Sequence, residues 1–216
     1  MTDLKLAFVK SMLARAQAVT QTEQIIKDAL ANNVPAIQIL DDGLVSAMSV
    51  IGDKFSESEI YIPDVLIAAR AMQAGMDILR PLLPNEKTTS KGTVVIGTVK
   101  GDLHDIGKNL VKYMLQGGGF NVVDLGNDVS PEKFAEAVRA NNAGVVAMSA
   151  LLTTTMTSMK DVVDGLTEAG LRDRVKVMIG GAPVTQDFAD KIKADGYAKD
   201  AGSAIHKASE LFGLES

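Results

Sequence analysis

The stretch TVVIGTVKGDLHDIGK, residues 93–108, contains the change from strand to helix that indicates the fold class. Its first seven residues form an apolar run typical of a strand, and a helical pattern starts at Ile106. Between them lies His104, one of two histidines in the chain, with Asp102 before it and Asp105 after it. Asp102 is close enough in sequence to hold one ring nitrogen of the imidazole, which leaves the other nitrogen for a metal or a proton. The alternative is a solvated loop histidine beside the carboxylates of a helix start.

Outward from this stretch, residues 93–216 alternate between strand and helix patterns. We predict strands at 93–99, 121–125, 144–149, 175–179 and 196–198, and helices at 106–116, 131–141, 154–169, 185–194 and 202–212. Near-continuous apolar strands, such as VVI at 94–96 and VVAM at 145–148, are typical of a parallel sheet covered by helices on both faces. The pattern predicts an α/β fold with a flavodoxin-like, doubly wound, five-stranded parallel sheet of order 2-1-3-4-5, whose switch point lies between the first and third strands.

The first 80 or so residues show helical spacing only. Apolar residues recur at three- and four-residue steps through 4–13, 25–30 and 37–51, and Pro63 suits the first position of a fourth helix. Four helices with short connections predict an antiparallel bundle. The segment PLLPNEKTTSKG, residues 81–92, has two prolines and no apolar period, so it marks a boundary. We therefore predict a helical cap domain at 1–84, a linker at 85–92 and the α/β domain at 93–216.

Composition narrows the classes of function. Apolar residues make up 46% of the chain and charged residues 23%, as in soluble globular proteins, and no apolar run approaches a membrane span. The N-terminal residues MTDLK lack the apolar core of a signal peptide, so we expect a cytoplasmic protein without a membrane partner. A net charge of -5 without a basic cluster argues against nucleic acid. With no cysteine and two histidines, a metal would have to arrive with most of its ligands attached.

The predicted topology brings a second loop to the histidine. The third strand ends in SALLTTT, residues 149–155, at the same edge of the sheet as the histidine loop. We expect Ser149 to hydrogen-bond Asp102, which gives a chain Ser149, Asp102, His104 that orients the imidazole. Helix N-capping is the alternative for Ser149 and for the threonines at 153–155.

Other motifs carry less. Gly180 and Gly181, after the fourth strand, let a ligand approach the backbone or make a tight turn. A phosphate loop is poorly supported, because five residues instead of four separate Gly101 from Gly107 and the hydroxyl residue is missing. A serine hydrolase is disfavoured because no nucleophile elbow is present. We interpret His206, the second histidine, as a surface or packing residue.

Three motifs in this order resemble those of the corrinoid-binding family, which includes the cobalamin module of methionine synthase, corrinoid-dependent mutases and corrinoid methyl-carrier proteins. They are Asp102-x-His104-x-x-Gly107, Ser149-x-Leu151 and Gly180-Gly181. The N-terminal segments GDKF, residues 52–55, and EIYIPDVLIAA, residues 59–69, look like the cap bundle of the methyl-carrier branch. The resemblance covers nearly the whole chain.

The resemblance implies a cobalamin or related corrinoid bound base-off, with His104 as the lower ligand of cobalt. Asp102 would hold His104, and Ser149 would hold Asp102. The corrin ring supplies four nitrogens, so one protein histidine suffices. The implied cofactor-binding residues are Asp102, Leu103, His104, Asp105, Ile106, Gly107, Ser149, Leu151, Thr153, Thr154, Gly180, Gly181, Tyr197, Ala198, Asp200 and Ala201, with Met72 and Met76 of the cap over the upper face. Ordinary bundle core is the alternative for the two methionines.

The function implied by the resemblance is that of a methyl carrier. Such a protein is a non-catalytic subunit that moves a methyl group between a substrate-specific methyltransferase and an acceptor methyltransferase using tetrahydrofolate or coenzyme M, and a reductive activating protein serves it. The donor would be a methylamine, methanol or an aryl methyl ether. The alternative is a cobalamin-dependent sensor, which usually carries a DNA-binding segment. A mutase subunit is disfavoured because those small subunits lack the cap.

Overall fold

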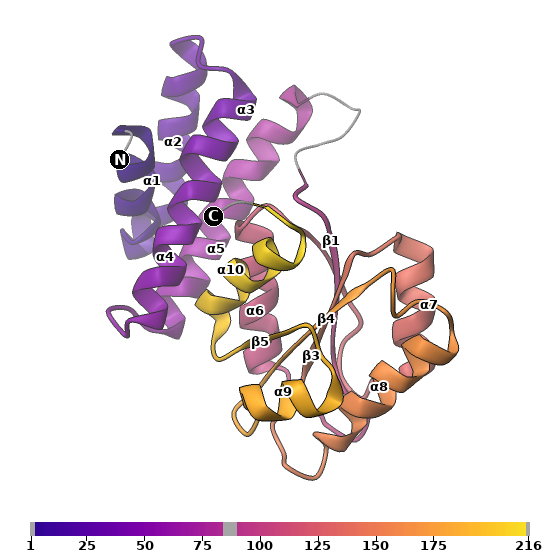
Figure 1. The fold of residues 1–216 in the computed structure, drawn as a ribbon. Helices are drawn as coiled ribbons and strands as arrows, with labels where there is room; N and C mark the ends of the chain where they lie inside the picture. Colours follow the sequence, from indigo (N-terminus) through magenta and orange to yellow (C-terminus); the bar gives the residue numbers. More distant parts are fainter. Residues whose placement is uncertain (1–2, 84–89, 215–216) are drawn as a thin grey trace. The chain divides into compact units, whose positions relative to one another are not determined.

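The structure is a computed structural model that describes residues 3–83 and 90–214 (Figure 1). It divides into two compact units, each described here by itself. The first contains the chain up to Ser90 together with Gln116–Gly119, and the second contains Lys91–Leu115 and the chain from Phe120 onward. The predicted linker at 85–92 lies for the most part outside the described residues.

The first unit is a helical bundle, as predicted. Its helices are α1 (Asp3–Met12), α2 (Ala18–Ala31), α3 (Ala36–Gln38), α4 (Ser46–Ser56) and α5 (Ile62–Leu79), with the π-helical segment η2 (Ile39–Val45) joining α3 to α4 and short 3-10 turns at η1 (Arg15–Gln17) and η3 (Arg80–Leu82). The predicted helix at 37–51 is thus the middle of one helical run. The fully buried side chains of this unit include Phe8, Met12, Ile26 and Met48. Their burial accounts for the apolar spacing in the sequence.

The start of α5 follows the residues that begin it. Pro63 lies in the first turn, where a missing backbone N–H costs nothing. The Asp64 carboxylate accepts a hydrogen bond from the Tyr61 backbone N–H at 3.1 Å, which satisfies one free donor and places a negative charge at the positive end of the helix dipole. The helix begins at Ile62, one residue before Pro63, at which the sequence predicts its start.

The second unit is an α/β domain with a five-stranded parallel sheet. Its elements are β1 (Thr93–Thr98), α6 (Ile106–Gly117), β2 (Asn121–Asp124), α7 (Pro131–Asn141), β3 (Val145–Ser149), α8 (Thr157–Glu168), β4 (Lys176–Gly180), α9 (Gln186–Ile192), β5 (Gly196–Ala198) and α10 (Ala201–Leu211). The strand order is β2-β1-β3-β4-β5, with every pairing parallel. The predicted flavodoxin-like fold is confirmed.

Alternate residues of the strands bury themselves on opposite faces of the sheet. On β1, Val95 belongs to a core shared with α7, α8 and α9, whereas Val94 and Ile96 belong to a core that includes Leu115 of α6 and Ala204 of α10. Each strand thus meets helices on both sides, and this is why the strands read as continuous apolar runs.

Four residues form one row at the carboxyl edge of the sheet. Thr98 of β1 is in register with Ser149 of β3, Ser149 with Gly180 of β4, and Gly180 with Ala198 of β5. The chain passes from β1 to β2 on one side and later to β3 on the other, so this row lies beside the switch point of the fold. Loops that leave the row are placed together by the strand register.

One helix boundary was predicted wrongly. The helix expected at 154–169 begins at Thr157, because residues 152–156 make a separate turn in which the Thr155 and Met156 amides donate to the Leu152 carbonyl oxygen at 3.1 and 3.2 Å. Thr155 is buried in this turn and is not a helix cap. Of the helices within 3–83 and 90–214, none has the length and apolarity needed to cross a membrane.

Candidate functional site

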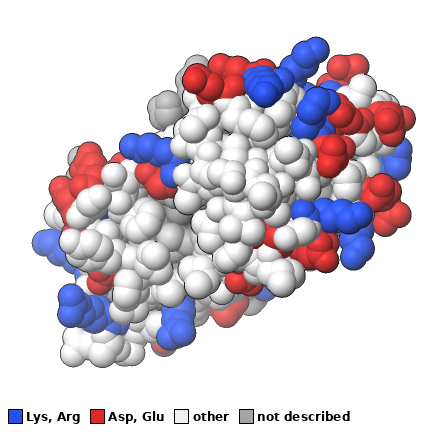
Figure 2. Space-filling model, turned by 90° about the horizontal axis from the view of Figure 1, so that it is seen from below, with Lys and Arg blue, Asp and Glu red and all other residues white. Residues whose placement is uncertain are grey.

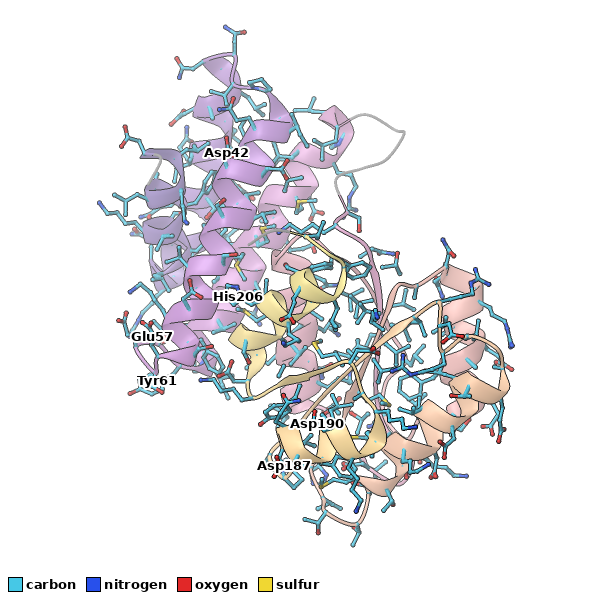
Figure 3. The ribbon with its side chains drawn as sticks, in the orientation of Figure 1. Asp42, Glu57, Tyr61, Asp187, Asp190 and His206 are labelled. Carbon is cyan, nitrogen blue, oxygen red and sulfur yellow. The ribbon has the colours of Figure 1, made fainter. Side chains whose placement is uncertain are left out.

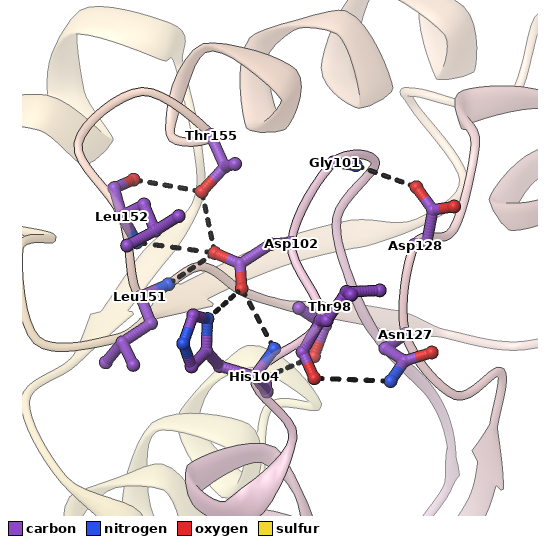
Figure 4. Close-up of polar contacts among 10 residues, drawn as sticks. Thr98, Gly101, Asp102, His104, Asn127, Asp128, Leu151, Leu152 and Thr155 are labelled. Atoms are coloured by element: carbon purple, nitrogen blue, oxygen red, sulfur yellow. Dashed lines mark hydrogen bonds and ion pairs between the residues drawn. The ribbon is translucent and has the colours of Figure 1, made fainter.

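Asp102 is the centre of the site (Figure 4). Its side chain is fully buried in the loop that follows β1. Oδ1 accepts hydrogen bonds from the His104 backbone N–H at 3.0 Å and from His104 Nδ1 at 2.8 Å. Oδ2 accepts hydrogen bonds from Thr155 Oγ1 at 2.6 Å and from the Leu151 and Leu152 backbone amides at 2.7 and 3.3 Å. Five donors therefore surround one carboxylate.

These donors keep the Asp102 carboxylate ionised. Burial by itself raises the pKa of a carboxyl group, because it disfavours the charged form. At Asp102 the hydrogen bonds from Thr155, from the His104 and Leu151 amides and from the His104 ring outweigh burial, and they hold its pKa well below the usual range. A buried charge with this many partners is a fixed point around which the loop is built.

The ionised Asp102 determines the state of the His104 ring. A carboxylate only accepts hydrogen bonds, so Nδ1 of the neutral imidazole carries the proton and donates it to Oδ1. Nε2 then has a free lone pair, and 51% of the His104 side chain is exposed. The His104 carbonyl oxygen also accepts a hydrogen bond from Thr98 Oγ1 at 3.0 Å. The loop thus presents one oriented imidazole nitrogen, which is the arrangement expected of a metal ligand.

The predicted hydrogen bond from Ser149 to Asp102 is wrong. Thr155 makes the contact instead, 53 positions along the chain from Asp102. Ser149 is the last residue of β3, where its backbone carbonyl oxygen accepts a hydrogen bond from the Val99 N–H at 3.0 Å. The turn at 152–156 brings the Thr155 hydroxyl back to the carboxylate and aims the Leu151 and Leu152 amides at the same oxygen. The sequence predicts at most a helix-capping role for Thr155, and no local pattern around it indicates the contact with Asp102.

Apolar side chains surround the histidine in sequence. Leu103 and Ile106 are 69% and 76% exposed, and Leu151 and Leu152 are also exposed. Figure 2 draws Lys, Arg, Asp and Glu in colour against the white of all other residues, and both charge signs are interspersed in that view. Leu103 and Ile106 lie on either side of His104 in the chain, and Leu151 and Leu152 contact Asp102 through their backbone amides. Exposed apolar side chains at these positions are suited to a large, partly apolar ligand.

The glycines of the predicted site differ in whether the protein fold requires a residue without a side chain. A methyl group on Gly107 would meet no atom within 4 Å, so the fold itself does not require glycine there. A methyl group on Gly180 would lie 2.9 Å from the Ala198 carbonyl oxygen, and one on Gly181 would lie 1.9 Å from the Ala150 carbonyl oxygen. Gly181 also has a φ of +130°, which glycine alone adopts easily. Close approach of neighbouring backbones therefore explains Gly180 and Gly181 without a ligand.

Asp105 has a local partner on α6. Its Oδ2 accepts a hydrogen bond from Asn109 Nδ2 at 3.1 Å, and its backbone oxygen accepts one from the Asn109 N–H at 2.7 Å. Thr153 and Thr154 are exposed beside the buried Thr155. These contacts place Asp105 at the start of α6, in the helix-start role considered from the sequence.

The predicted residues at the far end of the site lie around β5. Tyr197 is partly buried, Ala198 and Ala201 are buried, and Asp200 caps α10 by accepting a hydrogen bond from the Ser203 N–H at 2.7 Å. The second histidine, His206, is exposed on α10 (Figure 3). In the helical unit, Met72 is 4% exposed and Met76 is partly buried, both on α5.

The donor set suits a metal that brings its own ligands. Among the described residues there is no group of three or more His, Cys, Asp or Glu side chains able to hold a metal ion. His104 offers a single free nitrogen, backed by a carboxylate whose remaining positions are all taken. A corrinoid needs one axial nitrogen from the protein, so the residues present fit that group.

The fold and the site define a class of protein: a parallel α/β domain with an oriented histidine at its switch point, suited to a cofactor that brings its own metal. Family comparison agrees: a B12 binding domain matches residues 92–206, and a second B12 binding domain model matches residues 15–80. The chain belongs to the B12-binding domain family, and cobalamin or a related corrinoid is its cofactor.

Its relatives include corrinoid proteins of Methanosarcina species. The chain is 46% identical over 187 residues to the trimethylamine corrinoid protein of Methanosarcina barkeri, with 86% of each chain covered. It is 48% identical over 175 residues to dimethylamine corrinoid protein 1 of Methanosarcina acetivorans, covering 81% of this chain and 82% of that one. Among solved structures, a chain of the methanol:cobalamin methyltransferase complex of M. barkeri matches with a TM-score of 0.81 and 31% identity, over 99% of this chain and 81% of that one.

Proposed function

We propose that this protein is a methyl carrier in which His104 Nε2 is the lower ligand of a base-off corrinoid. A bound corrinoid would supply the cobalt that carries the methyl group, and the protein's own residues would hold and orient it. The observation that supports this most strongly is the free Nε2 of His104, since Nδ1 is tied to Asp102 at 2.8 Å and Asp102 is saturated by five donors. The carrier itself would catalyse no reaction.

In this proposal the buried contacts act on the basicity of His104. The ionised Asp102 stabilises positive charge on the imidazole and makes Nε2 a stronger donor to a metal. Thr155 and the Leu151 and Leu152 amides limit that effect by drawing negative charge toward Oδ2. The network would therefore set how strongly His104 Nε2 donates to a metal held by the cofactor.

The remaining predicted residues belong to the proposal as the lining of the cofactor site. Leu103, Ile106, Leu151 and Gly107 would contact the ring and tail of the cofactor. Residues around β5 and β4 would close the far end, and Met72 and Met76 of the cap domain, which we place at 1–84, would cover the upper face. The open space at Gly107 supports this assignment, because the protein fold gives no other reason for glycine there.

The partners are inferred from the relatives. Their names specify trimethylamine and dimethylamine, so we propose a methylamine as donor, delivered by a substrate-specific methyltransferase. A second methyltransferase would pass the methyl group to tetrahydrofolate or coenzyme M, and a reductive activating protein would restore the cobalt after oxidation. The solved complex of a methanol:cobalamin methyltransferase supports a carrier that works with a separate enzyme.

The absorption spectrum of the purified protein with hydroxocobalamin tests the ligand assignment. His104→Ala is expected to abolish nitrogen coordination from the protein, and His206→Ala, which changes the other histidine, is the matched control and should leave the spectrum of the wild type. Equal spectra for His104→Ala and the wild type would refute the assignment.

Methyl transfer from tri-, di- and monomethylamine, with a methyltransferase encoded beside the carrier, tests the donor. Transfer from none of them would exclude methylamines.

A further inference from the structure

A second loop holds the histidine loop from the side opposite Thr155. This loop, which we call the clamp loop, comprises residues 125–130 between β2 and α7. Asp128 Oδ1 accepts a hydrogen bond from the Gly101 N–H at 2.8 Å, and the Asp128 N–H donates to the Asp102 carbonyl oxygen at 3.1 Å. Asn127 Nδ2 donates to the Leu103 carbonyl oxygen at 3.2 Å (Figure 4). Three consecutive residues of the histidine loop are thus held by two residues of the clamp loop.

The backbone of the clamp loop is itself in an uncommon conformation. Asp128 has a φ of +52° and Gly126 a φ of +81°, both in the left-handed region. Asp and Asn tolerate this region better than most side chains do. The left-handed residue at 128 turns the chain so that both its N–H and its carboxylate meet the histidine loop. An ordinary surface loop would need neither feature.

The clamp loop is anchored at both ends. The Thr98 N–H donates to the Gly126 carbonyl oxygen and the Val129 N–H donates to the Thr98 carbonyl oxygen, each at 3.0 Å. At the other end, Asp124 Oδ1 accepts hydrogen bonds from the Gly126 N–H at 2.9 Å and from Lys108 Nζ at 2.6 Å. The clamp loop is therefore fixed to β1 and to α6, the two elements between which His104 lies.

We infer that Asn127 and Asp128 are positioning residues that hold the backbone of 101–103. This backbone keeps the Asp102 carboxylate in hydrogen-bonding position to His104. The inference rests on the proposed function, in which His104 Nε2 binds cobalt. Neither residue touches His104, so their effect passes through the Asp102 and Leu103 backbone. Both residues are exposed, and each contributes hydrogen bonds of the ordinary kind. Loss of one should shift the coordination equilibrium of His104 about threefold, and loss of both about tenfold.

Three variants separate the hydrogen bond from the backbone conformation. Asp128→Asn keeps a carbonyl oxygen for the Gly101 N–H and tolerates a positive φ, so it is the conservative control. Asp128→Gly keeps the positive φ and removes the acceptor. Asp128→Gly combined with Asn127→Ala removes both side-chain contacts. All three change exposed residues, and circular dichroism and thermal unfolding of the full chain would verify that each variant folds.

The main readout is electron paramagnetic resonance of the full chain loaded with cobalamin in the Co(II) state. Nitrogen coupling from the lower ligand measures the ratio of histidine-bound to histidine-free cobalt. We expect Asp128→Asn to match the wild type within twofold, Asp128→Gly to lower the ratio about threefold and the double variant about tenfold. An unchanged ratio in the double variant would overturn the inference, because a merely structural loop would change the unfolding transition and leave the coordination ratio alone.

A readout without cofactor keeps the inference separate from the proposed function. Nitrogen-15 NMR of the apo protein reports which ring nitrogen of neutral His104 carries the proton, and amide exchange reports the Gly101 N–H. In the double variant we expect a larger fraction of the Nε2–H tautomer and faster Gly101 exchange, with Asp128→Asn like the wild type. If cobalt in the wild-type protein shows no coupling to a histidine nitrogen, the proposed function fails. The inference about Asn127 and Asp128 is then tested by the tautomer fraction alone, and an equal fraction in the double variant and the wild type would overturn it.

Discussion

Thr155 donates its hydroxyl to Oδ2 of Asp102 at 2.6 Å, across 53 positions of the chain. Asp102 holds the His104 ring through its other oxygen, so this contact joins the loop after β3 to the proposed cobalt ligand. The hydroxyl has one proton and two acceptors within reach, the Asp102 carboxylate and the Leu152 carbonyl oxygen at 2.9 Å. The charged oxygen at the shorter distance is the stronger acceptor.

Thr155→Val should weaken the protein more than Ser149→Ala. Valine has the shape of threonine without the hydroxyl, so the variant removes a hydrogen bond to a buried charge and should lower the free energy of unfolding by about 1.5–3 kcal/mol. Ser149 makes no contact with Asp102, and its change to alanine should cost about 0.5 kcal/mol or less. Urea unfolding of the apo protein compares the two, with Thr155→Ser as the control that keeps the hydroxyl. A larger loss for Ser149→Ala would contradict the assignment.

Gly107→Ala separates folding from cofactor binding. An added methyl group meets no atom of the protein and alanine favours a helix, so the apo protein should keep or gain stability by up to about 1 kcal/mol. The same methyl group would fill space assigned to the corrinoid, and the affinity for hydroxocobalamin should fall about tenfold. Thermal unfolding and equilibrium titration measure the two effects.

Gly181→Ala provides the contrast to that variant. Its methyl group would lie 1.9 Å from the Ala150 carbonyl oxygen at a φ of +130°, so the apo protein itself should lose more than about 2 kcal/mol of unfolding free energy. Equal stability of the alanine variants at 107 and 181 would contradict the conclusion that the fold requires glycine at 181 and not at 107.

Asp124 and Lys108 should depend on each other for stability. The Lys108 side chain is 1% exposed, and its ammonium lies 2.6 Å from Asp124 Oδ1. Asp124→Asn leaves this buried cation without a counter-charge and should cost about 3 kcal/mol or more. Adding Lys108→Met to that variant removes the unpaired charge and should recover part of the loss. A double-mutant cycle in urea measures the coupling, and strictly additive losses would rule it out.

The same pair predicts a pH dependence. Burial raises the pKa of Asp124, but hydrogen bonds from Lys108, the Gly126 amide and Lys112 outweigh it and lower the pKa to about 2, from an ordinary value of 3.8. The folded state therefore binds this proton less tightly than the unfolded state does. The stabilisation is fully present above pH 3.8 and is lost as the pH falls toward 2, by about 2 kcal/mol in all. Subtracting the unfolding free energy of Asp124→Asn from that of the wild type at each pH should isolate this slope; a flat difference would contradict it.

Met72 and Met76 should differ in what they stabilise. Met72 is 4% exposed, so Met72→Ala should lower the free energy of unfolding by about 2–4 kcal/mol. Met76 is partly buried, and Met76→Ala should cost about 1 kcal/mol or less. If Met76 covers the upper face of the corrinoid, its alanine variant should also shorten the lifetime of the methylated carrier in water. An unchanged lifetime would assign Met76 to the bundle alone.

Much of the fold was predictable because the burial of side chains imposes a local pattern of apolar residues on the sequence. Strands covered on both faces appear as apolar runs, and bundle helices repeat apolar residues at three- and four-residue steps. Five alternating strands and helices predicted a doubly wound sheet. The alternation alone does not specify the strand order, and the structure has the flavodoxin-like order that we expected. The start of α8 could not be predicted in this way. The turn at 152–156, which precedes this helix, is stabilised by a hydrogen bond from Thr155 to Asp102, 53 positions away in the chain.

The pairing of Asp102 with His104 could be predicted from the sequence alone. The two residues are two positions apart in one loop, so the carboxylate reaches both the backbone amide and the ring of the histidine. The absence of cysteine and the scarcity of histidine also determined that a metal must bring its own ligands.

The surroundings of that pair depend on the three-dimensional fold. Ser149 ends the third strand and Thr155 follows it. Both carry a hydroxyl group, and which of them reaches Asp102 depends on how the turn after β3 aims its amides. Asn127 and Asp128 lie in a different loop, and only the parallel pairing of β1 with β2 brings them to residues 101–103. A hydrogen bond between distant loops leaves no periodic trace in the sequence, because its geometry is determined by strand register and backbone turns.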